Sequence, residues 1–564
     1  MTTYGSSTVS RVLAIPELLF MIFQFLDDAS NASNVRVSKR WSEIALDVLW
    51  KEVLNLHHLF SLLAPLEQSG STYKFIRLLE SSDWLRFERY RRRVRRLIHS
   101  SSQTKQILHH SVFDDVARSR TSLDILPNMH TFHWDDSLAH SVIFMHKNVK
   151  SFALSLPKDN SIRSSIFTRF FEDIVTRMPK ISSIDLRFEF PVKLIEGDVI
   201  RLLSNLPNLD RITLPRFCLT TKIAETASRL GKLQTLEYQY HRYQGRGDPA
   251  DIVDFRPKLT EVSFPSLFDF STTIAFEDAI KFLTIPFSPS NLTIIYLDSP
   301  TTETPTTLSA LLNAIPEACP LLKSLTLTSA LFNDMELTSA PEKEDCVNID
   351  TLRPLLKCPK LTSFEIEHHY PLHLELSDIE EIATSWPGVE TLVLNPQPTY
   401  LEDSNLTLRA LLPFARHCSK LQRLGLFMDA TTIDFPAAES TSVYQLPTFR
   451  SLHCLTVGVS LIQEDGAVAL FLSQICPLHC EIEKGVTWEN PVSQELADKL
   501  ELRLKKWEKV EELLPLLTKL RIEERERAHL LKQEVQDLRI RTEVLMDKFA
   551  LAGTPVNLDG CITL

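Results

Sequence analysis

The chain has 564 residues, of which 44% are hydrophobic and 24% charged, proportions that are ordinary for a folded globular protein. A net charge of −11 gives no indication of a nucleic-acid-binding surface. Glycine is scarce, with 13 residues against 31 prolines, which argues against glycine-rich phosphate loops and favours many short elements.

The first ten residues, MTTYGSSTVS, contain no basic stretch followed by an apolar core, so we expect no signal peptide and interpret residues 1–10 as a disordered tail. The sequence holds no run of about 18 uncharged apolar residues, so no transmembrane segment is expected. Its 9 cysteines are not closely paired, which is typical of reduced thiols. We therefore expect a protein of the cytoplasm or the nucleus.

Three short amphipathic runs fill residues 11–55. In the first run, apolar residues recur at helical spacing from Ile15 to Leu26, and Pro16 suits the first turn of a helix. Phe20, Met21 and Phe25 make the opposite side of the same run apolar too. About forty residues cannot bury so much apolar surface by themselves. The surplus predicts a docking surface.

The same stretch resembles an F-box, in the form that is common in fungal proteins. The resemblance rests on Ile15-Pro16-Glu17-Leu18-Leu19, Ile22-Phe23, Phe25-Leu26, Val37, Lys39-Arg40-Trp41, Ala45, Asp47 and Leu49-Trp50. Ser38 and Phe20 stand where the family usually has a cysteine and a polar residue. The alternative is an ordinary three-helix fragment of a larger core.

The F-box resemblance implies a partner. F-boxes dock onto the Skp-type adaptor of a Skp–cullin–F-box ubiquitin ligase, mainly through their first helices. Carried over to this chain, the resemblance implies adaptor binding by Ile15, Pro16, Leu18, Leu19, Ile22, Phe23, Val37, Trp41, Leu49 and Trp50.

Residues 56–125 are predicted to form a helical connector, in which seven arginines fall between positions 86 and 96. Such a cluster suits a nuclear-localisation signal or an acidic partner. However, Trp84, Phe87, Tyr90, Val94 and Leu97 follow helical spacing, so the arginines could instead line a solvated helix face. The pattern is similar to the segment that follows the F-box in many fungal relatives.

An internal repeat runs through residues 126–485, and its core is a proline, cysteine or small residue followed by x-L-x-x-L-x-L. The clearest copies lie at 126–134, 178–186, 206–214, 230–238, 256–264, 319–327, 358–366, 386–394 and 418–426, with weaker copies at 146–154, 290–297 and 449–457. Helical runs separate the copies, so each unit is predicted to be a helix, a turn and a short strand that stacking neighbours bury.

The repeats resemble the irregular leucine-rich repeats that follow F-boxes, and they predict an α/β solenoid that curls into an arc. Its concave side would be a long recognition surface for a target protein, lined for example by Lys323, Ser324, Thr326, Glu365, Glu367, Thr391, Arg423 and Gly425. The alternative is an ordinary α/β domain with a parallel sheet.

Sequence motifs for catalysis, cofactor binding or metal binding are weak throughout the chain. The four cysteines Cys319, Cys358, Cys418 and Cys476 recur at one repeat position, which indicates packing. Cys476 with His479 and Cys480, and the histidines His368, His369 and His373, lack a second ligand pair at zinc-site spacing. No GxSxG, P-loop, HExxH or GxGxxG sequence occurs. We therefore expect no catalytic residue, no cofactor and no metal.

Residues 488–550 are rich in Leu, Glu, Lys and Arg, and predict a long helix with heptad seams. One seam line holds Leu500, Trp507, Leu514, Ala528, Val535 and Phe549, and the other holds Leu496, Val510, Leu517, Leu531, Leu538 and Leu545. Pro515 is expected to kink or split the helix, and Arg521 and Glu524 interrupt the seam. One interpretation is a coiled coil that self-associates or recruits a partner, and the other is a pair of helices that cap the final repeat.

The last four residues, Cys561-Ile562-Thr563-Leu564, have the form of a prenylation signal at Cys561, within a predicted flexible tail at 551–564. No basic cluster supplies a second membrane signal, so chance explains the match better.

Together these features predict a non-catalytic substrate-recognition subunit of a ubiquitin ligase, which binds a Skp adaptor and cullin complex at one end and a target along the repeats. The alternative function is a ligase-independent scaffold that uses the repeats and the coiled coil.

Overall fold

The computed structural model describes residues 13, 15–102, 104–157, 164–238, 244–329, 346–401, 404–432, 446–486 and 494–551. The chain forms two compact units, Met1–Pro300 with Ala310–Leu322 (unit 1), and Thr301–Ser309 with Lys323–Leu564 (unit 2). The predicted tails, residues 1–10 and 551–564, lie outside the described residues apart from Leu551. Cys561 lies outside them as well.

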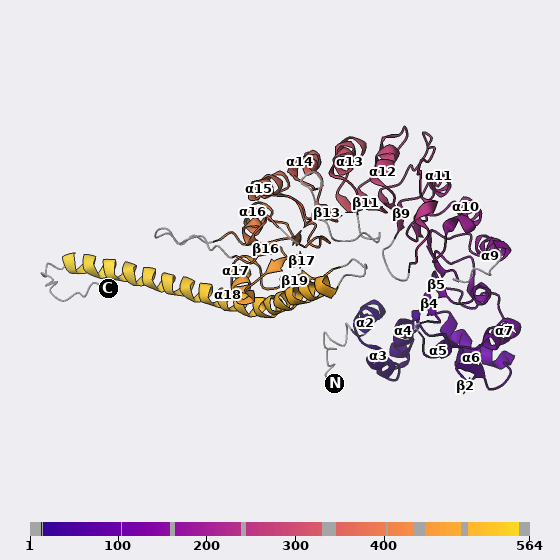
Figure 1. Cartoon of the computed structure of the whole chain (residues 1–564). Helices are drawn as coiled ribbons and strands as arrows, with labels where there is room; N and C mark the ends of the chain where they lie inside the picture. The colour runs from indigo at the N-terminus through magenta and orange to yellow at the C-terminus, as the bar shows by residue number, and fades with distance from the viewer. Residues whose placement is uncertain are drawn as a thin grey trace, which may run out of the picture. The chain divides into compact units, whose positions relative to one another are not determined.

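Unit 1 begins with three short helices and continues into a ladder of parallel strands (Figure 1). The helices are α2 (Pro16–Gln24), α3 (Asp28–Asn34) and α4 (Lys39–Leu49). The strands pair in the order β1 (Glu52–Val53), β4 (Arg96–Ser100), β5 (Thr131–Asp135), β6 (Ser151–Ser155), β7 (Ser183–Arg187), β8 (Arg211–Leu214), β9 (Thr235–Tyr238), β10 (Asp269–Thr273) and β11 (Ile294–Ser299).

Helices connect successive strands of unit 1 and lie on one side of them (Figure 1). They are α5 (Leu56–Phe60), α6 (Ser81–Arg91), α7 (His110–Ser119), α8 (Leu138–Ser141), α9 (Ser164–Arg177), α10 (Glu196–Ser204), α11 (Thr221–Ala227) and α12 (Phe276–Thr284), with short 3-10 helices at Val142–Phe144, Val192–Leu194 and Pro249–Asp251. An antiparallel hairpin, β2 (Leu66–Ser69) and β3 (Thr72–Phe75), lies between α5 and α6. The helix α13 (Pro305–Ala318) has residues in both units.

Unit 2 repeats the same arrangement of parallel strands and connecting helices. Its strands pair in the order β12 (Ser324–Ser329), β13 (Ser363–His368), β14 (Thr391–Leu394), β15 (Arg423–Leu426), β17 (Cys454–Gly458) and β19 (Glu481–Lys484), and β16 (Asp429–Ala430) pairs separately with β18 (Leu461–Ile462). The helices are α14 (Ile349–Leu352), α15 (Leu376–Ser385), α16 (Leu411–His417), α17 (Asp465–Ile475) and α18 (Gln494–Leu551), with 3-10 helices at Arg353–Lys357 and Leu408–Ala410.

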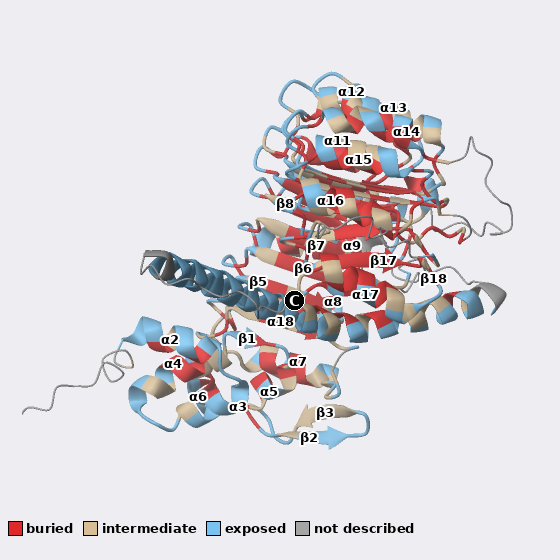
Figure 2. Ribbon diagram, turned by 90° about the vertical axis from the view of Figure 1, so that its left-hand side faces the viewer, coloured by how far each residue is buried: buried red, intermediate tan, exposed pale blue. Residues whose placement is uncertain are grey.

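The leucine-type positions of the repeats form the core between strands and helices. In β13, for example, Phe364 and Ile366 are buried against the helices, whereas Glu365 and Glu367 between them are only partly buried on the other face. The same alternation recurs along the ladders. Figure 2 shows the strands largely in the colour of buried residues, whereas the helices carry both buried and exposed residues. The prediction of a leucine-rich-repeat-like solenoid behind an F-box-like helical module is confirmed.

Two predicted features of the repeats were wrong. The copy at 256–264 forms no strand, and Val262, predicted to point inward, is 75% exposed; the strand β10 comes later, at Asp269–Thr273. The connector at 56–125 is not purely helical, because it contains the β2–β3 hairpin and the strand β4. The parallel ladder of unit 1 therefore begins before residue 126.

The long C-terminal helix α18 is continuous, so Pro515 does not split it. No helix in the described part of the chain combines the length and the apolar composition that a membrane span needs.

Candidate functional site

The helices α2, α3 and α4 have a small core of their own. Leu19 and Phe23 of α2 are fully buried against Ile44 and Ala45 of α4, and the ring of Trp41 meets that of Phe23 edge-on, with 5.3 Å between ring centroids. Pro16 begins α2, where the helix does not need its missing N–H. One apolar stripe of α2 is thus used to hold the module together.

Polar side chains fix the turns between these helices. Asp27 accepts a hydrogen bond from the Ser30 amide at 2.8 Å at the start of α3. Ser38 accepts one from the Trp41 amide at 3.2 Å at the start of α4, which explains why serine suits this position. The fully buried Asn31 donates to the Phe23 carbonyl at 2.9 Å and to the Leu26 carbonyl at 3.3 Å, and so ties α3 to the end of α2.

The other side of α2 is apolar and exposed, and we call it the α2 apolar face. Phe25 is 88% exposed, and each of the remaining members is at least 37% exposed. The α2 apolar face consists of Ile15, Leu18, Met21, Ile22, Phe25 and Leu26, and Val37 is exposed just before α4. Exposed apolar side chains gathered on one short helix are typical of a protein-interaction site.

The ten predicted adaptor-binding residues separate into three groups. The surface holds Ile15, Pro16, Leu18, Ile22 and Val37, whereas Trp41, Leu49 and Trp50 are half-buried. Leu19 and Phe23 lie in the core of the module, because a three-helix unit this small needs at least one apolar stripe for itself. The prediction omitted Met21, Phe25 and Leu26, although the apolar character of both sides of the run was visible in the sequence.

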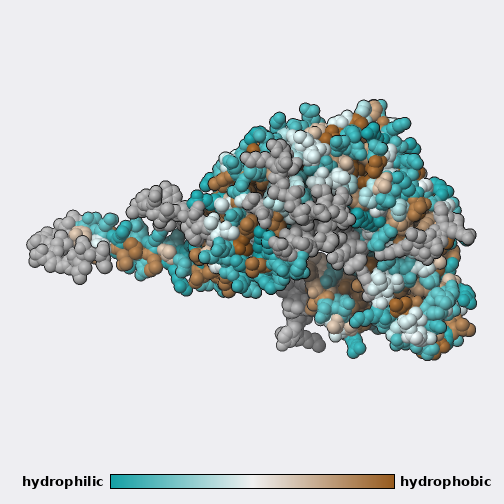
Figure 3. All heavy atoms as spheres, in the orientation of Figure 1, coloured by the Kyte–Doolittle hydropathy of each residue, from teal (hydrophilic) through white to brown (hydrophobic). Residues whose placement is uncertain are grey.

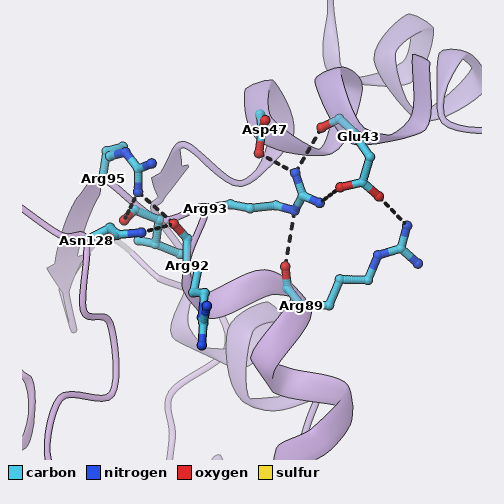
Figure 4. Close-up of polar contacts among 8 residues, drawn as sticks. Glu43, Asp47, Arg89, Arg92, Arg93, Arg95 and Asn128 are labelled. Carbon is cyan, nitrogen blue, oxygen red and sulfur yellow. Dashed lines mark hydrogen bonds and ion pairs between the residues drawn. The ribbon is translucent and has the colours of Figure 1, made fainter. Parts of the chain in front are cut away.

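Two arginines attach the helical module to α6, and Figure 4 shows this arginine clasp of Arg89, Arg93, Glu43 and Asp47. Arg93 pairs with both the Glu43 and the Asp47 carboxylates of α4, and its Nη1 donates to the Glu43 carbonyl at 2.9 Å. Arg89 reaches the same Glu43 at 3.1 Å. The hydrogen bond from Arg93 lowers the pKa of Glu43. The acidic partner of these two arginines thus lies within the chain.

The other arginines of the cluster differ in their surroundings. The Arg92 side chain remains 68% exposed and pairs with Glu88 at 2.6 Å, while Arg91 is largely buried and donates to the Asp124 carbonyl at 2.7 Å. Neither a fully solvated face nor a free basic patch describes the whole cluster.

The end of α4 continues directly into the ladder. Trp50 follows α4 and packs on Tyr90 of α6, with 5.0 Å between ring centroids. β1 then pairs in parallel with β4, with Glu52 opposite Arg96 and Val53 opposite Leu97. The helical module α2–α4 and the repeats of unit 1 are therefore joined by a short, structured connection.

The strand face opposite the helices is polar in unit 2. Among the predicted lining residues, Ser324, Thr326, Glu365, Glu367, Thr391 and Arg423 are partly buried there and Lys323 is exposed, whereas Gly425 is buried. A Cβ at Gly425 would lie 2.8 Å from Cγ1 of Val393 on β14, which leaves room only for glycine unless Val393 shifts. Neighbouring strands place Thr326 opposite Glu365 and Thr391 opposite Arg423.

A charged cluster on the last strands was missed by the sequence. Arg423 Nη2 lies 2.7 Å from Glu483 Oε2, and Thr456 Oγ1 donates to the same carboxylate at 2.6 Å. Glu483 belongs to β19, which the repeat pattern did not predict. Burial raises the pKa of the nearby Glu365 carboxyl, and Arg423 opposes that shift.

The corresponding face of unit 1 contains a pocket of about 430 Å³ across β4 to β7. Its polar lining includes Ser100, His133, Asp135 and Arg187. Ser100 donates to Asp135 at 2.6 Å, and burial lowers the pKa of His133, with a further contribution from Arg187. Farther along the face, burial together with Glu237 raises the pKa of Asp269 to about 6.

The predicted histidine and cysteine positions have structural surroundings. His368 Nε2 lies 3.0 Å from the Glu303 carbonyl, and His369 contacts Thr399. The repeat cysteines are buried, and burial raises the pKa of Cys418 to about 12. Among the residues that the structure describes, no three His, Cys, Asp or Glu side chains come together as a possible metal site.

A comparison with protein families bears on the helical module α2–α4. Residues 16–55 match the F-box-like family model, and this match covers α2 to α4 and β1. No curated protein matches the chain significantly. Among solved structures, the chain is similar to the Rad7 and Elc1 complex of yeast, with 12% identity and a TM-score of 0.36 over 63% of this chain and 81% of that chain.

Two bacterial leucine-rich-repeat proteins are also similar. The protein LegL7 from Legionella pneumophila has 11% identity and a TM-score of 0.31 over 65% of this chain and 93% of its own. A protein from Bacteroides eggerthii DSM 20697 has 12% identity and a TM-score of 0.26 over 76% of this chain and 72% of its own.

Proposed function

We propose that this chain is the substrate-recognition subunit of a Skp–cullin–F-box ubiquitin ligase in the cytoplasm or the nucleus. The helical module would hold the Skp-type adaptor, and the polar strand face of the repeats would hold a target protein. Ubiquitin-transfer chemistry would belong to other subunits, and this chain would contribute by keeping an acceptor lysine near the charged carrier.

The observation that carries the proposal is the α2 apolar face on a module that matches the F-box-like family. Phe25 and Met21 are apolar side chains exposed to water, which is energetically unfavourable. They are not needed in the core of the module, which Leu19 and Phe23 already fill. Covering such side chains with a partner removes apolar area from water, and this is the main driving force of most protein association.

The strand face suits the second half of the proposal. Its side chains, such as Glu365, Thr391 and Arg423, are polar and held at fixed spacing by the strand register. Such an array can match the surface of one protein in shape and charge, and charge complementarity contributes mainly to specificity. The identity of a target does not follow from these residues.

Adaptor binding can be tested with the full chain and a purified Skp-type adaptor. Leu18→Glu combined with Ile22→Glu places two charges on the α2 apolar face without touching the buried Leu19 and Phe23. We expect the wild-type chain to bind, and the double variant to bind at least about tenfold more weakly, because desolvating one unpaired charge already costs more than 1.4 kcal/mol.

The control is Leu85→Glu, which adds a charge at a leucine of α6 that lies outside the α2 apolar face and is 79% exposed, against 37% for Leu18 and 39% for Ile22. This variant should bind the adaptor like the wild type. Failure of a folded wild-type chain to bind, or equal weakening by Leu85→Glu, would contradict the proposal. Circular dichroism of all variants shows whether they are folded.

The alternative is a ligase-independent scaffold. In cells, the Leu18→Glu, Ile22→Glu variant should lengthen the half-life of proteins that associate with the repeats if the chain is a ligase receptor. A scaffold would leave those half-lives unchanged while the same associations persist.

A further inference from the structure

The helix α18 changes its surroundings along its length. Leu500, Trp507, Val510 and Leu514 are buried against unit 2, and Leu500 joins Leu401, Phe427 and Val459 in one cluster. Arg521 donates to Ser473 at 2.7 Å, and Arg525 reaches the Gln474 carbonyl at 3.4 Å. Among the described residues of α18, Arg525 is the last with a hydrogen bond to the repeats. The first half of α18 therefore covers the end of the repeats, as one sequence interpretation expected, but it does so as part of one continuous helix rather than a pair of helices.

The second half of α18 extends beyond the repeats of unit 2 with apolar side chains exposed to water (Figures 1 and 3). Leu531, Val535, Leu538 and Leu545 are between 48% and 61% exposed. Together with Ala528 and Thr542 they follow steps of three and four residues, which place them on one side of a helix. We call this set the distal seam.

The distal seam continues the stripe that packs on unit 2. Trp507 and Leu514 occupy the same heptad positions as Ala528, Val535 and Thr542, and between Leu514 and Ala528 the polar Arg521 and Glu524 interrupt the stripe. The interruption comes where the helix leaves the repeats. Beyond it the distal seam holds three a and three d positions between Ala528 and Leu545.

We propose that the distal half of α18 forms a parallel, two-stranded coiled coil with a second copy of this chain. The occupant is a second copy because the seam is complementary to itself in shape and in charge. This self-association is independent of adaptor binding, which uses α2 in unit 1.

The side-chain shapes favour two parallel strands. In heptad terms, Val535 and Thr542 occupy a positions, whereas Leu531, Leu538 and Leu545 occupy d positions. A β-branched residue at a with leucine at d is the combination that favours parallel dimers. The Thr542 hydroxyl already donates to the Leu538 carbonyl of its own helix at 2.8 Å, so burial in the seam leaves it satisfied.

The charges beside the seam agree with the parallel orientation. Glu534 occupies a g position and Arg539 the following e position, so a parallel dimer forms the Glu534–Arg539 pair twice across the interface. In the antiparallel register that pairs Leu538 with Thr542, Glu534 would face Lys548, but Arg539 would face Arg539 and Arg541 would face Arg541. Like charges at such sites are repulsive, although Arg527 near Lys532 is also unfavourable at one end of the parallel form.

Light scattering of the full chain at micromolar concentration tests the proposal. We expect a mass twice the 64.5 kDa of one chain. Leu538→Glu with Leu545→Glu should shift the mass to one chain, or raise the dissociation constant at least about a hundredfold. The matched control, Ile540→Glu with Val544→Glu, changes two side chains that are 50% and 48% exposed but lie off the seam, and it should remain a dimer.

A monomeric wild-type chain, or equal dissociation by the control pair, would overturn the proposal. Orientation is tested by Thr542→Cys, which under oxidising conditions should form a disulfide-linked dimer well above the wild-type background only when the helices are parallel and in register. A dimer that this variant does not cross-link would overturn the parallel arrangement. Adaptor binding measured on the same samples should stay unchanged, so failure of the dimer and failure of the proposed function remain distinguishable.

Discussion

The indole Nε1 of Trp507 donates a hydrogen bond to the carbonyl oxygen of Ser460 at 2.9 Å, and the Trp507 side chain is fully buried. Ser460 follows β17, and its own hydroxyl accepts from the Met428 amide at 2.9 Å. One side chain of α18 is thereby joined to two neighbouring repeats of unit 2. The helix α18 covers both α17 and the edge of the ladder at β19, so that edge needs no further strand to cover it.

Replacing Trp507 by phenylalanine should loosen the first half of α18. The substitution removes the indole N–H, leaves the buried Ser460 carbonyl without this donor, and creates a small cavity, so we expect a loss of about 1–3 kcal/mol. Hydrogen exchange of backbone amides between residues 500 and 518 should accelerate accordingly. Leu516→Ala, at a side chain that is 68% exposed, should leave this exchange almost unchanged.

Leu19 and Leu18 are neighbours in sequence with opposite roles. Leu19→Ala removes a fully buried side chain and should destabilise the α2–α4 module by about 2–4 kcal/mol. Leu18→Ala changes an exposed position and should alter stability by less than about 0.5 kcal/mol. Protection of α4 amides from exchange measures both effects, and similar losses in the two variants would contradict the assignment of core and docking face.

Breaking the arginine clasp should loosen the attachment of the helical module to α6. Arg93→Ala removes the partner of both Glu43 and Asp47, whose side chains are about half exposed, so we expect a modest cost of about 1 kcal/mol. Arg92→Ala, which removes only a pair with Glu88, is the control. Limited proteolysis between α4 and α6 should become faster in the first variant alone.

The clasp should also depend on pH. The pKa of Glu43 is lowered in the folded chain, so its stabilising contribution is present above the pKa of an unfolded glutamate and is lost as the pH falls through the folded value. Acid below about pH 4 should therefore weaken the wild-type clasp. A clasp that weakened instead on raising the pH from 5 to 8 would contradict this account.

Asp269 should make unit 1 less stable at neutral pH. Its pKa of about 6 lies above that of an unfolded aspartate, so the folded chain holds the proton more tightly and loses stability as the pH rises from about 4 to about 6. A two-unit shift corresponds to about 3 kcal/mol, and partial exposure reduces the expected effect to about 1 kcal/mol.

The test is Asp269→Asn, which keeps the shape and removes the charge. We expect higher stability in urea at pH 7 and little change at pH 4, where the wild-type carboxyl is largely protonated. Stabilisation at pH 4 that equalled the gain at pH 7 would show that packing, rather than ionisation, distinguishes the two side chains.

The repeats could be predicted where leucine-type residues alternate, as in β13 and β15, because such strands are buried on one face only. β10 escaped prediction because its buried positions are filled by Phe270, Thr272 and Thr273, which do not resemble the leucine pattern. The false copy at 256–264 contains Phe264 at a positive φ of 48°, a backbone conformation incompatible with a strand. Residues 256–264 thus have the residue types of a repeat strand, but their backbone conformation does not allow one.

The α2 apolar face illustrates a different limit of sequence-based prediction. The sequence of α2 is apolar on both sides, and periodicity alone cannot separate a stripe that packs from one that binds. The distinction between Leu19 and Leu18 depends on where α4 lies, and hence on contacts between residues far apart in the chain. Arg93 likewise belonged to a run whose partners, Glu43 and Asp47, lie more than forty positions away.

Because β1 pairs directly with β4, the parallel strands of unit 1 lie at regular distances from the helical module. Each parallel strand lies about 4.8 Å from the next, so every side chain on the polar face stands at a graded distance from the helices that precede β1. A ligand bound to side chains of β7 instead of β6 would therefore lie one strand spacing farther from these helices, in the same orientation. Insertion or loss of one repeat would change this distance in the same discrete step.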